Sequence, residues 1–241
     1  MTDRVAPAPS AAGRPGFDPE LVSHDPEFEQ LHVRGHPVAP DRLTAEALRL
    51  RFASPPAGWT PEITADGRLP LAHEPPREAA VLIPLVVHGA GTTVLLTRRT
   101  AHLHDHAGQI SFPGGGVERH DVDAVATALR ETEEEVGLRA ESVEVLGLLP
   151  RYATATGYLV TPVVGLVAPG FSLQLDRFEV EEVFEPPLAF LMDPAHHERR
   201  LIDFDGRRRT FYAMPYEAGR RYFIWGATAA MLRNLYHLLR A

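Results

Sequence analysis

Hydrophobic residues fall into short runs along the middle of the chain, and these runs predict strands. The runs AAVLIPLVVHG (79–89) and TTVLLTRR (92–99) are rich in β-branched residues. A short turn that contains glycine separates them, which predicts a hairpin in the centre of a sheet. Further strands are predicted at QISF (109–112), VEVLGLL (143–149) and LVTPVVGLV (159–167).

Helical patterns occur before, within and after this strand-rich region. The segment DRLTAEALRLRF (41–52) has helix formers behind a candidate cap at Thr44, and a second helix is predicted over 123–136. The chain ends in a third pattern, and its apolar residues make one helical stripe: Met231, Leu232, Leu235, Leu238 and Leu239. This stripe packs in the core or forms the seam of a homodimer.

Two further segments complete the expected fold. The segment EVEEVFEPPLAFLM (179–192) begins as a helical turn and is interrupted by two consecutive prolines. Between 201 and 214, Asp205-Gly206 separates two apolar runs, which is typical of a β-hairpin. Strands and helices interleave irregularly, so the expected fold class is α+β, or a mixed α/β sandwich with one central sheet.

The N-terminal part of the chain differs from the rest in composition. It is rich in proline, alanine and glycine without periodicity, and residues 1–38 are expected to form a flexible tail. Residues 39–241 are long enough for one domain with a helical extension at its start. The apolar fraction of 44% is ordinary for a globular core.

Charge and composition exclude several classes of function. The net charge of −8 disfavours nucleic acid as a partner, and acidic residues in a site would need a cation between them and any phosphate. The chain has no cysteine, which excludes disulfides, thiolate zinc sites and cysteine nucleophiles. It also has no lysine, which excludes Schiff-base chemistry. No apolar run is long enough to span a bilayer, so no membrane partner and a cytoplasmic location are expected.

Four glutamates crowd the end of the predicted helix at 123–136. With about 100° per residue, Glu131, Glu134 and Glu135 lie together on one arc, whereas Glu133 points to the other side of the apolar stripe. Arg130 precedes Glu134 by four residues, and an ion pair there would orient Glu134. Glu131 and Glu135 are therefore the better candidates for direct metal ligands.

The acidic residues of a helix more often face solvent than bind a ligand. The loop before this helix, however, favours a binding site. Pro113 and the three glycines that follow it come directly after a predicted strand. Such a turn without side chains can bring a strand end and a helix start close enough to share one site. Glycine turn, arginine and spaced glutamates together favour a metal site.

These residues resemble the box of the Nudix hydrolases, G-x5-E-x7-R-E-U-x-E-E-x-G-U, where U is apolar. Residues 130–138, RETEEEVGL, fit its second half, except that Thr132 replaces an apolar residue. In the first half, Gly115 and Asp121 keep the loop spacing but leave eight residues before Arg130. A one-residue insertion explains this departure, with Asp121 standing in for the first glutamate of the box and a helix N-cap as its candidate role.

A narrower resemblance extends upstream. Residues 95–116, LLTRRTAHLHDHAGQISFPGGG, look like the signature of the coenzyme A pyrophosphatase branch, LLTxRSxxLRxHxGQxxFPGG. The matching residues are Leu95, Leu96, Thr97, Arg99, Leu103, His106, Gly108, Gln109, Phe112, Pro113, Gly114 and Gly115. Thr100 replaces serine, and His104 replaces an arginine, which is a stronger phosphate ligand than histidine. The resemblance covers roughly residues 40–241.

The resemblance implies a Nudix-type sandwich and a metal-dependent hydrolysis of the diphosphate bond of coenzyme A or acyl-CoA. Alternatives are another nucleoside diphosphate derivative, such as ADP-ribose or NADH, and a module of this fold that senses a nucleotide without cleaving it. Mg²⁺ or Mn²⁺ would be held by Glu131 and Glu135 with help from Glu134. Glu179 and Glu182 are both candidates for a base or further ligand.

Substrate contacts are expected from the upstream signature. The candidates are Arg99, His104, His106, Gln109, Gly114 and Gly115, with Arg99 able to grip a phosphate through its bidentate fork. His102, His104 and His106 would share one face of an extended segment, as in some zinc sites. Polar contacts between this loop and the substrate are the favoured interpretation.

Overall fold

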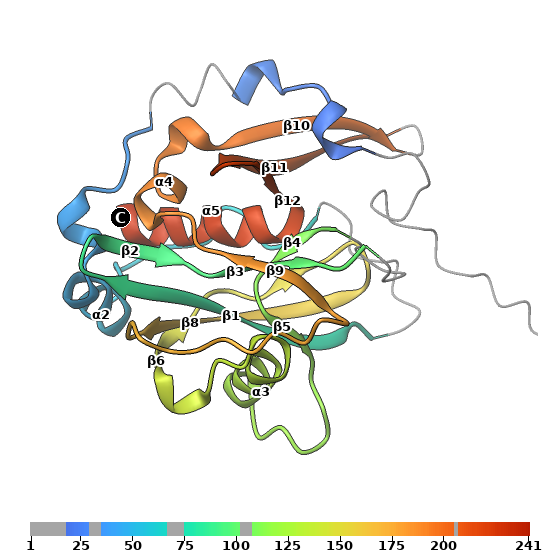
Figure 1. The fold of residues 1–241 in the computed structure, drawn as a ribbon. Helices are drawn as coiled ribbons and strands as arrows, with labels where there is room; N and C mark the ends of the chain where they lie inside the picture. Colours follow the sequence, from blue (N-terminus) through green and yellow to red (C-terminus); the bar gives the residue numbers. More distant parts are fainter. Residues whose placement is uncertain (1–17, 29–34, 67–74, 102–107, 205–206) are drawn as a thin grey trace, which may run out of the picture.

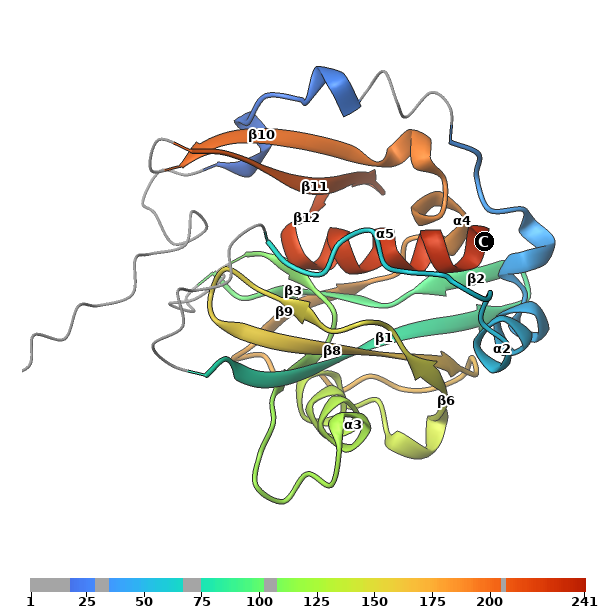
Figure 2. The same ribbon diagram turned by 180° about the vertical axis from the view of Figure 1, so that it is seen from behind.

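The structure is a computed structural model that describes residues 18–28, 35–66, 75–101, 108–204 and 207–241. The described residues form three sheets and several helices, with α3 and α5 on opposite faces of the largest sheet (Figures 1 and 2). Within the described residues, no helix is long and apolar enough to cross a membrane.

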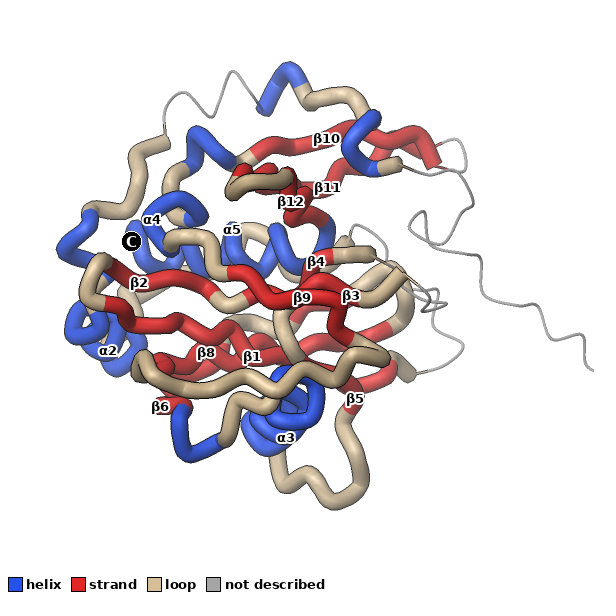
Figure 3. The backbone as a smooth tube through the Cα atoms, viewed as in Figure 1, coloured by secondary structure: helices blue, strands red, loops and turns tan. Residues whose placement is uncertain are grey.

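The largest sheet is mixed and has six strands (Figure 3). Its main order is β2 (Gly91–Val94), β1 (Arg77–His88), β8 (Tyr158–Val167) and β6 (Val143–Leu148), with β5 (Gly114–Gly116) paired to β1 and β7 (Tyr152–Ala153) paired to β8. The pair β1 and β8 is parallel, and the other pairs are antiparallel. The glycine segment is thus an edge strand of this sheet.

Two three-stranded sheets accompany it. One contains β4 (Ile110–Ser111), β3 (Leu96–Arg99) and β9 (Val180–Phe184), and the other contains β10 (Glu198–Phe204), β11 (Arg207–Glu217) and β12 (Arg221–Trp225). The α-helices are α2 (Ala45–Ala53), α3 (Ala124–Val136), α4 (Leu188–Leu191) and α5 (Gly226–Arg240). Short 3₁₀ turns are η2 (Pro19–Leu21), η3 (Pro40–Leu43), η4 (Ala140–Ser142) and η5 (Pro194–His196).

The core has two layers because the side chains of β1 alternate between the faces of the sheet. Leu82 and Val86 pack in one cluster with Ala128 of α3, whereas Ile83 packs in the other with Leu235 of α5. Burial of these apolar side chains, each contributing roughly 1.5–3 kcal/mol, fixes α3 against the sheet.

Most predicted elements are confirmed. The helix at 41–52 corresponds to α2, whose N-cap is Thr44: its hydroxyl accepts a hydrogen bond from the Ala47 N–H. The hairpin of β1 and β2 forms as expected. Strands β10 and β11 pair antiparallel on either side of the predicted turn at 205–206, which lies outside the described residues. The run at 92–99 is divided, however: β2 belongs to the large sheet and β3 to a different one.

The expected fold class is confirmed, because a central mixed sheet lies between helices, and two smaller sheets accompany it (Figure 1). One expectation about the strands was wrong. The segment predicted to begin as a helical turn at 179 is instead the strand β9, which pairs with β3. Its two valines, Val180 and Val183, favour an extended backbone, and pairing with β3 outweighs the helical tendency of the intervening glutamates. The two prolines do end this element, since α4 begins at Leu188.

Part of the segment predicted as a tail lies on the domain. The carboxylate of Asp25 accepts a hydrogen bond of 2.6 Å from Arg199 Nε, and Phe28 is buried against Tyr212. The backbone of Asp25 also pairs with Arg199 of β10. Residues 18–28 are therefore part of the folded unit, and composition alone cannot indicate such long-range contacts.

Helix α5 lies almost entirely in the interior. Of its residues, Met231, Leu232, Leu235, Leu238 and Leu239 are all buried within the chain itself. The apolar stripe of this helix is therefore core, and it leaves no seam for a second copy. A homodimer through another surface stays a prediction.

A partly buried polar network ties the loop after α2 to α5. The carboxylate of Glu62 accepts hydrogen bonds from Tyr212 (2.8 Å) and Arg233 (2.8 Å) and forms an ion pair with His237. Burial alone would raise the pKa of Glu62, but the hydrogen bonds from His237 and Arg233 outweigh burial and lower it to about 2. The charged carboxylate therefore stabilises the fold.

Replacing Glu62 with glutamine is expected to lower the free energy of unfolding by about 1–2 kcal/mol at neutral pH, with the partial exposure of the group discounted. Because the folded pKa lies below the ordinary value of 4.5, this contribution is complete above pH 4.5 and disappears as the pH falls through about 2. Urea unfolding of both proteins across that range measures it. The exposed Glu46→Gln variant on α2 serves as control, and a Glu62→Gln difference that is independent of pH would contradict the assignment.

Candidate active site

The glycine segment and α3 form one unit at the edge of the large sheet (Figure 1). Gly114 pairs with Val81 of β1, and a Cβ atom at Gly114 would lie 2.4 Å from the Ala80 carbonyl oxygen. The φ of Gly114 is +152°, in the region that favours glycine. Only a residue without a side chain therefore allows the strand to approach β1 this closely.

Glu135 is the most buried carboxylate of α3. Its exposed fraction is 5%, and its Oε2 accepts a hydrogen bond of 3.2 Å from the Gly114 N–H. Burial, with a smaller contribution from the neighbouring carboxylates of Glu179 and Glu131, raises the pKa of Glu135 to about 8 against the opposing effects of the Gly114 N–H and of Arg99. A buried carboxylate with a raised pKa is typical of a functional site.

Glu131 lies directly beneath the second glycine. A Cβ atom at Gly115 would come within 2.4 Å of Glu131 Oε2, so the absence of a side chain there makes room for this carboxylate. Partial burial raises the pKa of Glu131, the ion pair with Arg130 opposes that rise, and the nearby Glu134 adds to it. Glu131 and Glu135, the first and last candidate metal ligands of the helix, thus both contact the glycine segment.

Arg130 connects the loop before α3 to the carboxylates on the helix. Its Nε and Nη2 atoms donate to the two oxygens of Asp121 at 3.0 and 2.9 Å. Its Nη1 atom donates to Glu131 (2.9 Å) and to Glu134 (3.1 Å). The hydrogen bonds from Arg130 and from the Glu118 N–H hold the pKa of Asp121 well below its usual range. Arg130 is therefore fixed by Asp121 and in turn orients Glu131 and Glu134.

The N-cap of α3 differs from the expected one. Asp123, not Asp121, caps the helix, because its carboxylate accepts a 2.8 Å hydrogen bond from the Ala126 N–H. This leaves Asp121 free to bind the guanidinium of Arg130.

Arg99 and Glu179 approach the same site from the second sheet. Arg99 lies 3.5 Å from Glu135 Oε1 and 3.8 Å from Glu179 Oε2. The backbone of Glu179 is held by Thr100, whose N–H donates to the Glu179 carbonyl oxygen at 2.9 Å. A register shift between Arg98 and Arg99 allows this approach. One guanidinium therefore links two carboxylates that come from different elements.

Glu182 lies on a different surface. It is opposite Arg98 in the β3–β9 pair, 3.8 Å from its Nη1, and also forms an ion pair with Arg220. Of the two candidates for a base or further ligand, the structure brings Glu179 to the cluster and leaves Glu182 outside it. Glu134 sits at the rim, with a side chain that is 61% exposed.

The remaining candidates lie in or beside the segment before β4. His102, His104 and His106 fall outside the described residues, whereas Gln109 is half-buried and its carbonyl oxygen accepts a hydrogen bond from the Arg99 N–H. In the part of the chain that the structure describes, no three histidine or carboxylate side chains converge tightly enough to enclose a metal ion as they stand. The guanidinium groups of Arg99 and Arg130 contact the carboxylates of the candidate site.

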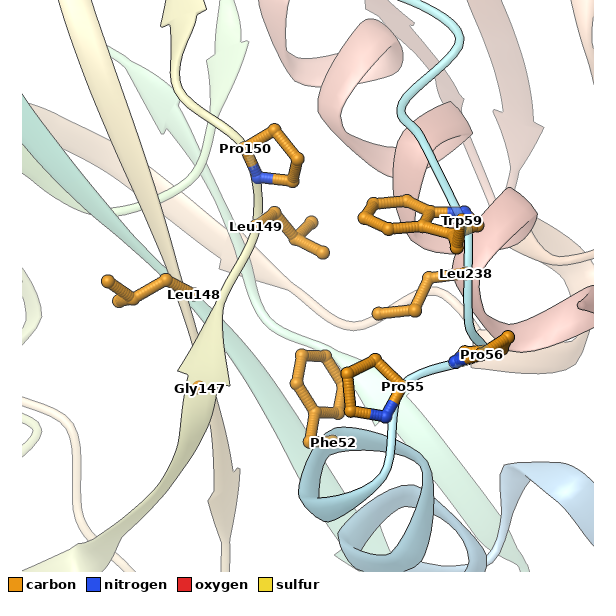
Figure 4. Close-up of a pocket in the computed structure, with 9 residues that line it drawn as sticks. All are labelled: Phe52, Pro55, Pro56, Trp59, Gly147, Leu148, Leu149, Pro150 and Leu238. Carbon is orange, nitrogen blue, oxygen red and sulfur yellow. The ribbon is translucent and has the colours of Figure 1, made fainter.

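The chain also has an apolar pocket of about 450 Å³ between α2, the end of β6 and α5 (Figure 4). It is lined by Phe52, Pro55, Pro56, Trp59, Gly147, Leu148, Leu149, Pro150 and Leu238. None of the carboxylates described above contributes to its wall. Its lining offers no acid, base or anion-binding side chain, so it is not the candidate site.

Comparison with known proteins decides the family. The NUDIX domain family profile matches residues 76–205, which contain the glycine segment, α3, Arg99 and Glu179. The chain belongs to the Nudix hydrolase family. Hydrolases of this family cleave diphosphate bonds and generally use divalent metal ions, so this Nudix chain is a pyrophosphatase.

Curated relatives agree with this assignment. The uncharacterized Nudix hydrolase NudL of Escherichia coli K12 is 44% identical over 159 residues, which cover 66% of this chain and 81% of NudL. NudL of Shigella flexneri serotype 5b is 44% identical over 168 residues, covering 70% of this chain and 84% of its own.

Solved Nudix structures are more distant in sequence. The Nudix hydrolase RenU of M. Smegmatis has a TM-score of 0.41 and 22% identity, covering 55% of this chain and 81% of RenU. The NUDIX domain of Shewanella oneidensis NrtR, solved in complex with ADP ribose, has a TM-score of 0.38 and 22% identity, covering 51% and 80%.

The departures of this chain from the Nudix box have structural explanations. Thr132, which replaces an apolar residue, is buried, and its hydroxyl donates to the Ala128 carbonyl oxygen at 2.6 Å. The internal hydrogen bond satisfies the polar group and allows threonine in an apolar position. Asp121 is the acidic residue of the loop that binds Arg130, despite the additional residue before the helix.

Replacing Asp121 with asparagine is expected to lower kcat/KM of this Nudix hydrolase by about tenfold or more, the usual cost of losing a group that orients ligand residues. Arg130 would lose its bidentate partner and no longer hold Glu131 in place. Steady-state kinetics on the substrate that the wild-type protein hydrolyses measures the loss.

The matched control is Asp123→Asn, since asparagine caps helices as well as aspartate does. Equal activity losses in the two variants would show that the start of α3 matters as a whole, and would refute a separate role for Asp121.

Proposed function

We propose that this Nudix hydrolase cleaves the diphosphate bond of coenzyme A or acyl-CoA, giving 3′,5′-ADP and a 4′-phosphopantetheine product. The observation that carries the proposal is the match of residues 95–116 to the coenzyme A pyrophosphatase signature. The geometry supports it, because Arg99 and Gly114, two residues of that signature, both contact Glu135. These two residues of the signature thus lie in the candidate active site.

Mg²⁺ or Mn²⁺ fits the chemistry of these donors. Glu131 and Glu135, with Glu134 beside them, would hold such an ion through carboxylate oxygens, the ligands that hard cations prefer. The pKa of about 8 at Glu135 supports this fit, since burial and the crowding of carboxylates are costs that a bound cation offsets. When bound, a divalent ion screens the charge of the diphosphate and activates water.

The residues of the chain contribute positioning and proton transfer. Arg130 keeps Glu131 and Glu134 oriented, and the absence of a side chain at Gly115 leaves room for the Glu131 carboxylate. Arg99 can donate to a substrate phosphate while it holds Glu135. Glu179, at the edge of this cluster, is the better placed of the two downstream glutamates to accept a proton from water.

The main argument for another substrate is His104, where the signature has arginine. ADP-ribose and NADH carry a diphosphate bonded to adenosine but lack the pantetheine part, and either could be the preferred substrate. A protein that binds nucleotide without cleavage is the second alternative. The presence of all three glutamates, Glu131, Glu134 and Glu135, favours catalysis.

A product assay tests the proposal. The purified protein with Mg²⁺ or Mn²⁺ is incubated separately with CoA, acyl-CoA, ADP-ribose and NADH, and the products are separated by chromatography. Release of 3′,5′-ADP from CoA or acyl-CoA at the highest kcat/KM is expected. Preferred cleavage of ADP-ribose or NADH would identify another nucleoside diphosphate derivative as the substrate. Binding of these compounds without cleavage would favour a protein that senses a nucleotide. A cytoplasmic location is part of the same proposal, because CoA and its thioesters are substrates of cell metabolism.

A further inference from the structure

An arginine stacked on a tyrosine lies at the start of β1. The guanidinium carbon of Arg77 is 4.0 Å from the centre of the Tyr158 ring, and the two residues are partners in the parallel pair of β1 and β8. Nη2 of Arg77 also donates to the Thr156 carbonyl oxygen at 3.4 Å. Stacking and this hydrogen bond hold a planar, exposed guanidinium in one orientation.

The charge of Arg77 has no carboxylate partner among the residues that the structure describes. The adjacent Glu78 does not pair with it, because both oxygens of Glu78 accept from Arg151. In a chain of net charge −8, an oriented arginine without an acidic partner is a candidate anion site. Arg77 is exposed.

Arg77 begins the strand that pairs with the glycine segment of the candidate active site. The Glu78 carbonyl oxygen accepts a hydrogen bond from Val117, the residue after β5, and Ala80 pairs with Gly115. Three residues of strand at about 3.3 Å each separate Arg77 from Ala80 by roughly 10 Å. Gly115 lies over Glu131, and the intervening Gly116 and Val117 are exposed. Figure 1 shows β1 beginning beside β5 at this end of the sheet.

We propose that Arg77, oriented by Tyr158, binds an additional phosphate of the substrate, one carried outside the diphosphate that is cleaved. This inference rests on the proposed function, because in CoA that group is the phosphate on the ribose 3′ oxygen. Arg77 is then a specificity residue that distinguishes nucleotides with a phosphorylated ribose from those without one.

The guanidinium chemistry favours a phosphate over other groups at this position. A phosphate monoester carries close to two negative charges at neutral pH and accepts bidentate hydrogen bonds from a planar fork. The face of the Tyr158 ring that the guanidinium covers is not open to a nucleobase.

The test compares CoA with 3′-dephospho-CoA, which differ only in this phosphate. Arg77→Ala is expected to lower kcat/KM for CoA by about 10- to 100-fold, the range for loss of a hydrogen bond between charged groups, and to leave kcat/KM for dephospho-CoA unchanged. Calorimetry with 3′,5′-ADP and 5′-AMP gives a reading that does not depend on catalysis: wild type should bind 3′,5′-ADP more tightly, and Arg77→Ala should remove the difference.

Two variants serve as controls. Tyr158→Phe keeps the ring on which the guanidinium stacks and should behave as wild type, and Arg51→Ala removes an arginine of α2, at the opposite end of β1 (Figure 1). Equal losses on both substrates in Arg77→Ala, or no loss on either, would overturn the inference while CoA hydrolysis stands. If the wild type cleaves neither CoA nor dephospho-CoA, it is the proposed function that fails.

Discussion

Replacing Glu135 with glutamine is expected to lower kcat/KM by about 10³-fold or more, equivalent to at least about 4 kcal/mol of transition-state stabilisation. The amide has nearly the same size and can still accept a hydrogen bond from the Gly114 N–H, so the fold should remain intact. It carries no charge to hold a divalent ion or to pair with Arg99. Kinetics at saturating Mg²⁺ measure the loss of activity, and thermal unfolding tests whether the fold is intact.

Glu133→Gln is the matched control for this variant. Glu133 is exposed on the same helix, two residues away from Glu135 and on another face. Its replacement should leave both activity and melting temperature near those of wild type. Mg²⁺-dependent activity of Glu135→Gln close to that of wild type would eliminate Glu135 as a metal ligand.

Adding a single methyl group at Gly115 should also impair activity strongly. The Cβ of alanine would stand 2.4 Å from Glu131 Oε2, so the carboxylate would have to move. We expect a loss in kcat/KM of about 10²-fold, since small misplacements of catalytic groups have effects of this size. The melting temperature should change little, because the group displaced is the end of a flexible side chain.

The neighbouring glycines provide controls of opposite kinds. A Cβ at Gly116 would meet no atom within 4 Å, so Gly116→Ala should be active and stable. Gly114→Ala should instead lose stability, because its Cβ would meet the backbone of Ala80 and Val81. If Gly115→Ala and Gly116→Ala have the same activity, the space above Glu131 is not required for function.

Local sequence patterns predicted the helices and strands whose formation depends only on residues close together in the sequence. The alternation and β-branched residues of β1 and β8, the cap of α2 at Thr44 and the periodicity of α5 all depend on nearby residues. The helical spacing likewise indicated that Glu131, Glu134 and Glu135 share an arc.

Local patterns could not predict burial or contacts that depend on residues far apart in the sequence. Helical spacing predicted Glu135 as a metal ligand but not its burial, which comes from the packing of α3 against β5. Glu179 and Glu182 were equivalent by spacing, and the register of β9 against β3 separates them. The position of Arg77 beside Tyr158 requires the parallel pairing of strands that are 81 positions apart in sequence numbering (158 minus 77).

The register shift in the β3–β9 pair also has an evolutionary consequence. Consecutive arginines belong to separate ion-pair groups: Arg99 joins Glu135 and Glu179, whereas Arg98 joins Glu181 and Glu182. Mutations that accumulate around Arg98 alter an outer surface shared with the sheet of β10 to β12, through the contact of Glu182 with Arg220. They leave the residues around Glu135 unchanged. Two neighbouring positions of one short strand can therefore diverge under independent selection.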